Sequence, residues 1–254
     1  MPQDMISLIL EQYLFDDAST LHACALVSRS FLVSSQKCLF HTIHLDHQRH
    51  CQRLHQVLLS NPSLFTYVRD LFLVGYESGG DISGPRPPPV HWACTEGTLH
   101  AVLNMFPHLR LLSLTFSYPA SDWNKLSVEF KMALGRVFTL PSLTVCKVQG
   151  ICNVPAECFR ALRHLKELSL VFASVTVAPE IISASTDAQK IQSLERFTLS
   201  VPPGDSTTID AVRTSIDMSH LRKVFVSSWM LNRVWEATKD STGSLDTLQW
   251  YYRR

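Results

Sequence analysis

Six residues in the N-terminal quarter of the chain have the types and the regular spacing from which metal sites are built. They are His41, His44, His47, His50, Cys51 and His55. A Zn²⁺ site requires ligands that converge on one point, and zinc signatures are spaced more tightly than this run. The run crosses the junction between an expected strand and an expected helix, so its side chains should point in different directions. We therefore interpret it as a polar strand and turn, and predict no metal and no cofactor.

Three cysteines, Cys146, Cys152 and Cys158, are six residues apart. An unpaired cysteine commonly behaves as a small core residue, and Cys146 falls at an apolar position of an expected strand. We interpret these thiols as packing residues. The chain also lacks GxSxG, HExxH, a kinase signature and a Gly-rich phosphate loop. We predict that the protein is not an enzyme; a hydrolase with an unrecognised site is kept as an alternative, and it would need Ser, His and Asp or metal ligands converging in a pocket.

Composition narrows the class further. Hydrophobic residues make up 46% of the 254 residues, enough for a core, and the formal net charge is +1. A nucleic-acid partner is not expected, because phosphate binding needs a concentrated positive surface. No stretch approaches the ~20 apolar residues of a membrane span, and the acidic first ten residues do not resemble a signal peptide. Seven cysteines without a CxxC, and no Asn-X-Ser/Thr acceptor, favour reduced thiols in the cytoplasm or nucleus.

A short apolar pattern recurs eight times: one apolar residue, a second three positions later, and a third two positions after that. Its first positions are residues 40, 68, 109, 143, 165, 194, 221 and 245. The last two apolar residues of each unit are two apart, so they share one face of a short strand. Helix-like stretches lie between most of the strands, at 53–60, 98–106, 128–138, 156–165 and 231–237.

This arrangement resembles the leucine-rich repeat, LxxLxL, whose units are about 20–29 residues long. It predicts an α/β fold: an irregular right-handed solenoid with a parallel sheet over residues 41–254. The usual Asn after the pattern is missing, so the turns must differ from the standard ones. A Gly/Pro-rich insert at 75–97 and the segment 200–208 are expected to be exposed loops. The PxxP within 85–89 is interpreted either as a linker or as a ligand for SH3 or WW domains.

Residues 1–40 lack the repeat and predict three helices. Apolar residues recur at helical spacing from Met5 to Tyr13, Asp17 offers a cap for a second helix, and a third helix is expected over about 28–39. The segments MPQDMISLIL, LHACALVSRSF and CLFHTIHL resemble the F-box, a three-helix adaptor motif. Met1-Pro2 stands at its Leu-Pro, and the Val27 to Phe31 segment stands at its Val-Cys-Arg-Trp element. Phe31 replaces the usual Trp and Ser28 the usual Cys.

The resemblance implies a fold in two parts and a function. A short three-helix F-box at 1–40 would dock on a Skp-type adaptor, and through it on a cullin scaffold, while the repeats at 41–254 hold a protein to be ubiquitinated. The chain would then be the substrate-recognition subunit of an SCF-type ubiquitin ligase. The residues carried over to adaptor contact, or to bracing that contact, are Pro2, Met5, Ile6, Ile9, Leu10, Val27 and Phe31. The alternative is an adaptor-independent interaction scaffold, in which a decayed F-box only caps the solenoid.

The residues that alternate with the inward pair should form the opposite, concave face of the sheet. That face mixes apolar side chains with charges of both signs, which suits a protein or peptide partner. The predicted target-binding residues are Asp70, Phe72, Lys147, Glu167, Arg196, Lys223, Phe225 and Tyr251. The aromatic members are the best anchor candidates, because aromatic side chains dominate interface hot spots. Contact with the long inserts is the alternative role for these aromatic residues.

Overall fold

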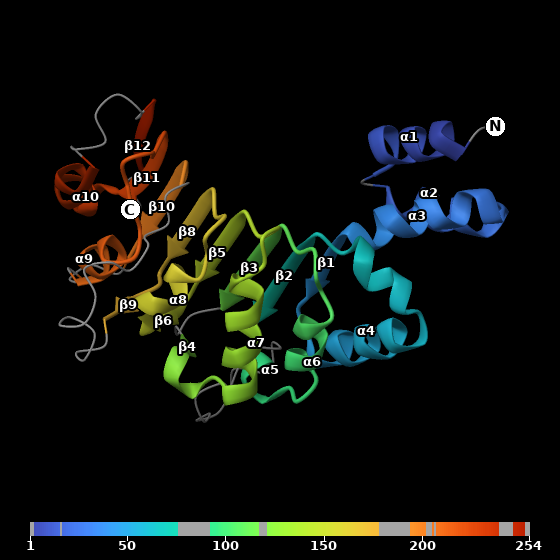
Figure 1. Cartoon of the computed structure of the whole chain (residues 1–254), viewed down its shortest axis with the longest axis horizontal. Coiled ribbons are helices and arrows are strands. Elements are labelled where there is room, and N and C mark those ends of the chain that lie inside the picture. Colours follow the sequence, from blue (N-terminus) through green and yellow to red (C-terminus); the bar gives the residue numbers. More distant parts are fainter. Residues whose placement is uncertain are drawn as a thin grey trace, which may run out of the picture.

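The computed structural model describes residues 3–15, 17–75, 92–116, 121–177, 194–201, 205, 207–238 and 246–251. It is a mixed α/β protein built on one eight-stranded parallel sheet (Figure 1), as the sequence predicts. The strands are β1 Thr42–Leu45, β2 Asp70–Gly75, β3 Leu111–Phe116, β5 Val145–Gln149, β8 Glu167–Val171, β10 Arg196–Ser200, β11 Lys223–Ser227 and β12 Thr247–Tyr251. They neighbour one another in the order in which the chain makes them.

The register of this sheet aligns the recurring apolar pair across all the strands. Leu71 on β2 pairs with Leu112 on β3, which pairs with Cys146 on β5. The row continues through Leu168 on β8 to Phe197 on β10. All five side chains are fully buried. Because side chains alternate along a strand, this register places one continuous apolar face against the helices.

A second regularity runs along the edge where the strands begin. The carbonyl of Arg69 accepts hydrogen bonds from the N–H groups of Arg110 and Leu111, at 2.6 and 3.0 Å. The carbonyl of Arg110 does the same for Thr144 and Val145, at 2.9 and 3.0 Å. The pattern repeats at each later step of the sheet, on the carbonyls of Thr144, Lys166, Glu195 and Arg222. From β3 onward, each entry of the chain into the sheet is therefore fixed to the preceding strand by the same two bonds, while at β2 the N–H of Arg69 donates to the carbonyl of His41, at 2.9 Å.

Helices follow the strands along one side of the sheet (Figure 1). They are α4 Gln48–Ser60, α5 Trp92–Thr95, α6 Leu99–Asn104, α7 Val128–Phe138, α8 Ala156–Arg160, α9 Thr207–Arg213 and α10 Leu231–Thr238, with the 3₁₀ turns η1 Pro62–Tyr67, η2 Trp123–Lys125 and η4 Ser228–Met230. Helix α7 shows how the sequence specifies this layer. The Ser127 hydroxyl accepts from the N–H of Phe130, which caps the helix, and Phe130, Leu134 and Val137 face the core.

Three helices precede the sheet, as predicted: α1 Gln3–Tyr13, α2 Ala18–Val27 and α3 Arg29–His41. They lie beyond the β1 end of the sheet (Figure 1). Asp17 caps α2 by accepting from Thr20, and hydrogen bonds from Thr20 and Ser19 lower the pKa of Asp17 to about 2. The buried core of these three helices consists of Ile6, Leu10, Leu21 and Cys38, and it is a separate cluster from the core beneath the sheet.

The prediction of a loop over 200–208 is wrong in part. Ser200 is the last residue of β10, and Val201 is buried. Asp205 then caps α9, because its carboxylate accepts from the N–H groups of Thr207 and Thr208. The Pro-Pro-Gly triplet favours a loop, but the Asp-x-Thr-Thr cap that follows it starts a helix. Most of the insert predicted at 75–97, with its PxxP, lies outside the described residues; within it, Trp92 begins α5 and its indole N–H donates to Val74, at 3.0 Å.

Two short pairs of parallel strands lie outside the eight-stranded sheet. They are β4 Ser121–Asp122 with β6 Ile151–Cys152, and β7 Val154–Pro155 with β9 Val175–Thr176. Gly150 makes the turn between β5 and β6 with φ of +69°. A Cβ at this position would collide with the carbonyl oxygen of Phe116. Only glycine fits at this position for two reasons, namely the positive φ and the close approach of the β3 backbone.

Gly150→Ala should destabilise the protein by at least about 2 kcal/mol, because strain at positive φ and the backbone clash add together. Gly135→Ala is the matched control, since Gly135 lies in α7 and an added Cβ there would have no neighbouring atom within 4 Å. That change should stabilise the protein by about 0.5–1 kcal/mol through helix propensity. Urea unfolding followed by circular dichroism measures both. Equal effects of the two substitutions would contradict the strand-to-turn geometry at Gly150.

Candidate functional site

Helix α1 carries two apolar stripes on different faces. Ile6 and Leu10 are 2% and 1% exposed and fill the small helical core. Met5, Ile9 and Tyr13, also four residues apart, are 51%, 38% and 77% exposed. One stripe is enough to hold α1 in place, so the second is surface that the fold itself does not use.

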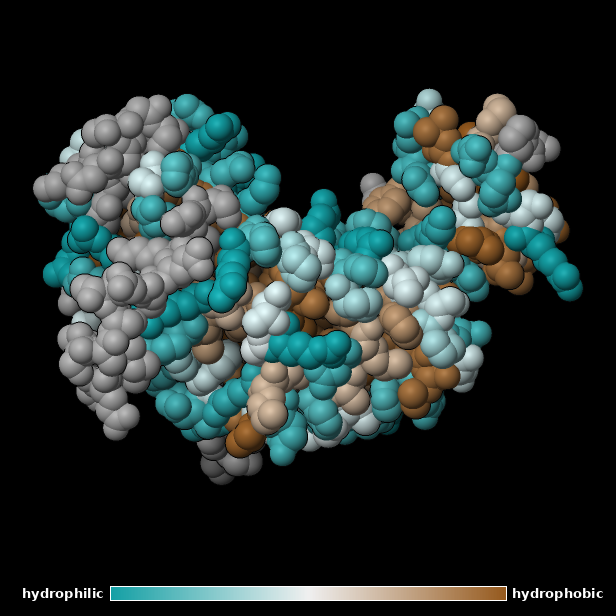
Figure 2. Space-filling model, viewed as in Figure 1, coloured by the Kyte–Doolittle hydropathy of each residue, from teal (hydrophilic) through white to brown (hydrophobic). Residues whose placement is uncertain are grey.

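Further apolar side chains are exposed on the same three helices. Leu26 and Val27 at the end of α2 are 88% and 73% exposed, and Leu8 on α1 is 52% exposed. We call the set Met5, Leu8, Ile9, Tyr13, Leu26 and Val27 the N-terminal apolar surface. Figure 2 shows hydrophobic side chains at the surface of this part of the molecule.

The residues predicted for adaptor binding divide into two groups. Met5, Ile9 and Val27 belong to the N-terminal apolar surface, where a partner can reach them. Ile6 and Leu10 are buried, so they are placed to brace α1 and not to touch a partner. Phe31 packs half-buried against the same small core, and Pro2 lies outside the described residues.

Three exposed residues, Leu8, Tyr13 and Leu26, were not among the adaptor-binding residues predicted from the sequence. Tyr13 follows Ile9 at the same four-residue spacing that separates Met5 from Ile9, so the helical period of the sequence could have identified Tyr13 as a member of the exposed stripe. The exposure of Leu8 and Leu26 depends on how α1 and α2 are tilted against α3, which no spacing in the sequence encodes.

The sheet face opposite the helices carries the predicted target-binding residues. The carboxylate of Glu167 on β8 bridges two neighbouring strands, at 3.4 Å from Lys147 Nζ and 2.8 Å from Arg196 Nη1. Lys223, level with Arg196 on the next strand, is exposed and has no ion-pair partner in the part of the chain that the structure describes. Parallel register thus assembles a charged row from residues far apart in the sequence.

Aromatic side chains stand at both ends of this face. Phe72 on β2 stacks on His44 of β1, with ring centroids 4.5 Å apart and planes 7° from parallel. Phe225 on β11 is half-buried. The backbone of Tyr251 lies in β12, and its side chain is outside the described part. Phe72 and Phe225 are therefore accessible at least in part, as anchors would have to be.

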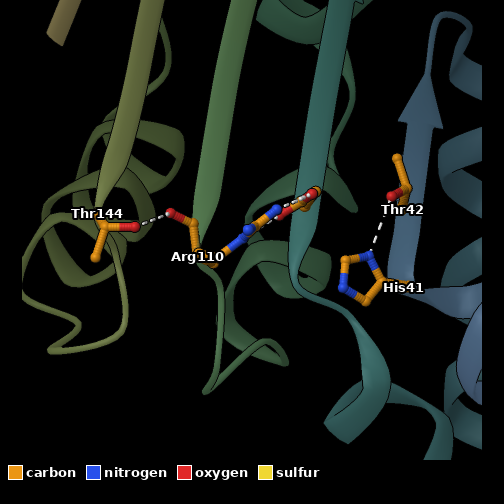
Figure 3. Close-up of polar contacts among 5 residues, drawn as sticks. His41, Thr42, Arg110 and Thr144 are labelled. Carbon is orange, nitrogen blue, oxygen red and sulfur yellow. Dashed lines mark hydrogen bonds and ion pairs between the residues drawn. The ribbon is translucent and has the colours of Figure 1, made fainter. Parts of the chain in front are cut away.

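Asp70 is an exception to the predicted open face. It is only 7% exposed, and both its carboxylate oxygens accept from the Arg110 guanidinium, at 3.2 and 2.8 Å (Figure 3). The bidentate pair raises the pKa of Arg110 above its usual value. Arg110 precedes β3 in the sequence and closes over the start of β2. Asp70, predicted as a target-binding residue, is therefore engaged at the strand edge and leaves little surface for a partner.

The histidine run is distributed over three elements. His41 ends α3, where burial lowers its pKa and its Nδ1 lies 3.3 Å from Thr42 Oγ1 (Figure 3). His47 caps α4 by accepting from the N–H of Arg49, and His50 lies 2.6 Å from Asp46. No group of three or more His, Cys, Asp or Glu among the described residues could hold a metal ion.

Cys146 is fully buried, and burial raises its pKa to about 12; Cys158 is partly buried, and burial raises its pKa to about 11. A thiol with so high a pKa is protonated at neutral pH and is a poor nucleophile. Cys146 is therefore a packing residue of β5, as predicted.

Neither a protein-family model nor a curated protein matches this chain. Within the described residues, no helix combines the length and the apolar character needed to cross a bilayer. The arrangement described above is one of accessible apolar side chains on α1 and α2 and mixed charges on the sheet. Both are chemically suited to binding other proteins.

The Asp70–Arg110 pair gives a stability prediction. Arg110→Ala should cost about 1–2 kcal/mol, because it leaves a mostly buried carboxylate without its donors, while the exposure of Arg110 limits the loss through solvent screening. Arg222→Ala is the control: Arg222 has the same place before β11, but no ion-pair partner among the described residues, so about 0.5 kcal/mol or less is expected. Denaturant unfolding compares the two variants. A loss in Arg222→Ala as large as in Arg110→Ala would mean that the ion pair contributes nothing specific.

Proposed function

We propose that this protein is the substrate-recognition subunit of an SCF-type ubiquitin ligase, acting by binding and not by catalysis. The observation that carries the proposal is the second apolar stripe of α1, formed by Met5, Ile9 and Tyr13. It lies within the segment whose sequence resembles an F-box. A Skp-type adaptor would cover this stripe, and a cullin scaffold would join through the adaptor.

The separation of the two cores favours this hypothesis over the scaffold in which the helices serve only as a cap. A cap would extend the core of the sheet over its first strand. Here the fully buried residues of the sheet core on that side come from β1 and α4, with only the half-buried Phe40 of α3 packed against them, while Ile6, Leu10 and Leu21 pack among themselves. The three helices therefore have a small core of their own and meet the sheet core through Phe40, which suits a docking module joined to a repeat array.

The regular sheet supports the repeat part of the proposal. Each unit supplies one strand to the eight-stranded sheet, the strands keep the same register, and each entry from β3 onward uses the same pair of backbone hydrogen bonds. These are the properties of a solenoid with leucine-rich-repeat-like units. The target protein would bind the open face, where Lys223 offers a positive charge on the same strand as Phe225 and the ion-pair row of Lys147, Glu167 and Arg196 lies on the neighbouring strands.

Ile9→Asp should abolish binding to a Skp-type adaptor, because a carboxylate in an apolar contact costs several kcal/mol. Ile9 is 38% exposed, so the fold should survive, as circular dichroism would check. Val128→Asp is the matched control, since Val128 is 65% exposed on α7, away from the three helices. Coexpression and pull-down with the adaptor measure the result. Retained binding by Ile9→Asp would refute the proposed docking surface.

Lys223→Glu and Phe225→Ala should each weaken capture of the target protein by about 10-fold or more while leaving adaptor binding intact. Arg53→Glu and Met132→Ala are controls of the same types on the helical side, where Arg53 and Met132 are exposed on α4 and α7. Proteomic comparison of proteins stabilised in cells carrying each variant gives the readout. Undiminished capture by both sheet-face variants would move the target site elsewhere.

A further inference from the structure

A polar pocket of about 440 Å³ lies where the N-terminal helices meet the starting edge of the sheet. Its walls come from α1, α3, η1 and the segments that lead into β2 and β3. Six of the residues that line it are Glu11, Lys37, His41, Tyr67, Arg69 and His108. Only His41 among them belongs to a pattern visible in the sequence, because the others are far apart in the chain and share no motif.

The pocket is rich in hydrogen-bond donors and has an excess of positive charge. Lys37 and Arg69 are cations, and the histidines add N–H groups. Glu11 is the one acid among these six residues. The hydroxyl of Tyr67 makes no hydrogen bond with a described residue. The nearby Asp70 does not neutralise Arg69, because Arg110 already engages both of its carboxylate oxygens.

The backbone of Arg69 is fixed by hydrogen bonds at the edge of the sheet. Its N–H donates to the carbonyl of His41 at 2.9 Å, and its own carbonyl accepts from Arg110 and Leu111. Its guanidinium makes a single long bond, from Nη1 to the carbonyl of His108 at 3.4 Å. The other guanidinium N–H groups find no acceptor in the described part of the chain. A guanidinium that extends from a fixed backbone and keeps most of its N–H groups unpaired suits bidentate recognition of an oxyanion.

We propose that this junction pocket binds a phosphate monoester group, with Arg69 and Lys37 as its main contacts and Tyr67 as a further donor. The volume falls in the range of small-molecule sites and exceeds what one inorganic anion fills, which favours a monoester with a few atoms beyond the phosphorus. The monoester could be a free small molecule or a phosphorylated side chain, since both present the same group. The inference goes beyond adaptor and target binding and stands independently of them.

Isothermal titration calorimetry on the purified full chain tests the site with glycerol 3-phosphate, and with glycerol as the matched neutral compound. We expect one molecule of glycerol 3-phosphate to bind saturably to each chain, and we expect no binding of glycerol. Arg69→Gln and Lys37→Gln should each weaken binding about 10-fold to 100-fold, as loss of charge-assisted hydrogen bonds does. Glu11→Gln should strengthen it, because the carboxylate repels the ligand. Arg222→Gln, which removes an arginine of the same edge outside the pocket, should leave it unchanged.

The proposal is overturned if glycerol 3-phosphate shows no saturable binding, if Arg69→Gln binds as tightly as the unchanged chain, or if Arg222→Gln is equally impaired. The last result would mean diffuse attraction to a positive edge. A phosphoserine peptide and its unphosphorylated form distinguish the sources. Tighter binding of the phosphopeptide than of glycerol 3-phosphate supports a phosphorylated protein as the source, and the reverse supports a small molecule; both results support the phosphate site.

Discussion

Backbone hydrogen bonding between parallel strands sets the register on which the rest of this structure depends. Because each strand from β3 onward starts from the same two bonds to the preceding carbonyl, these units enter the sheet at the same level. The apolar pair of each unit then falls in line with its neighbours, from Ile43 on β1 to Leu248 on β12. A slip of one residue in any strand would turn its apolar pair away from the helices and expose it.

The same register decides what the other face can do. Side chains that alternate with the apolar pair are brought within ion-pair distance although they belong to different repeat units. Glu167, which lies between Lys147 and Arg196, depends on this alignment, and so does the stacking of His44 on Phe72. The hollow visible between the N-terminal helices and the last strands is lined largely by hydrophilic side chains (Figure 2). Polar and aromatic groups on a rigid sheet make a binding surface whose geometry is set in advance.

The three N-terminal helices depend on a different kind of packing. Their short core leaves the second stripe of α1 exposed, and polar contacts such as Gln3 Nε2 with Ser34 Oγ at 3.0 Å hold α1 on α3. Helix α3 then continues directly into β1 at Thr42, so the two parts are joined without a linker. A pocket forms at this joint because neither a helix bundle nor a sheet edge can fill the space between them completely.

The sequence by itself determined the strand positions, the three helices and the parallel α/β class, because periodic apolar residues and local caps act over short distances. It also indicated that α1 has more apolar residues than one face can bury, without distinguishing the exposed Met5 and Ile9 from the buried Ile6 and Leu10. Only the tertiary structure decided that Ile6 faces inward while Tyr13 faces outward, that the carboxylate of Asp70 is bound by Arg110, and that a helix, α9, begins at Thr207. It alone brought Lys37 beside Arg69, because helix tilt and the packing of distant segments are set by contacts that no local spacing encodes.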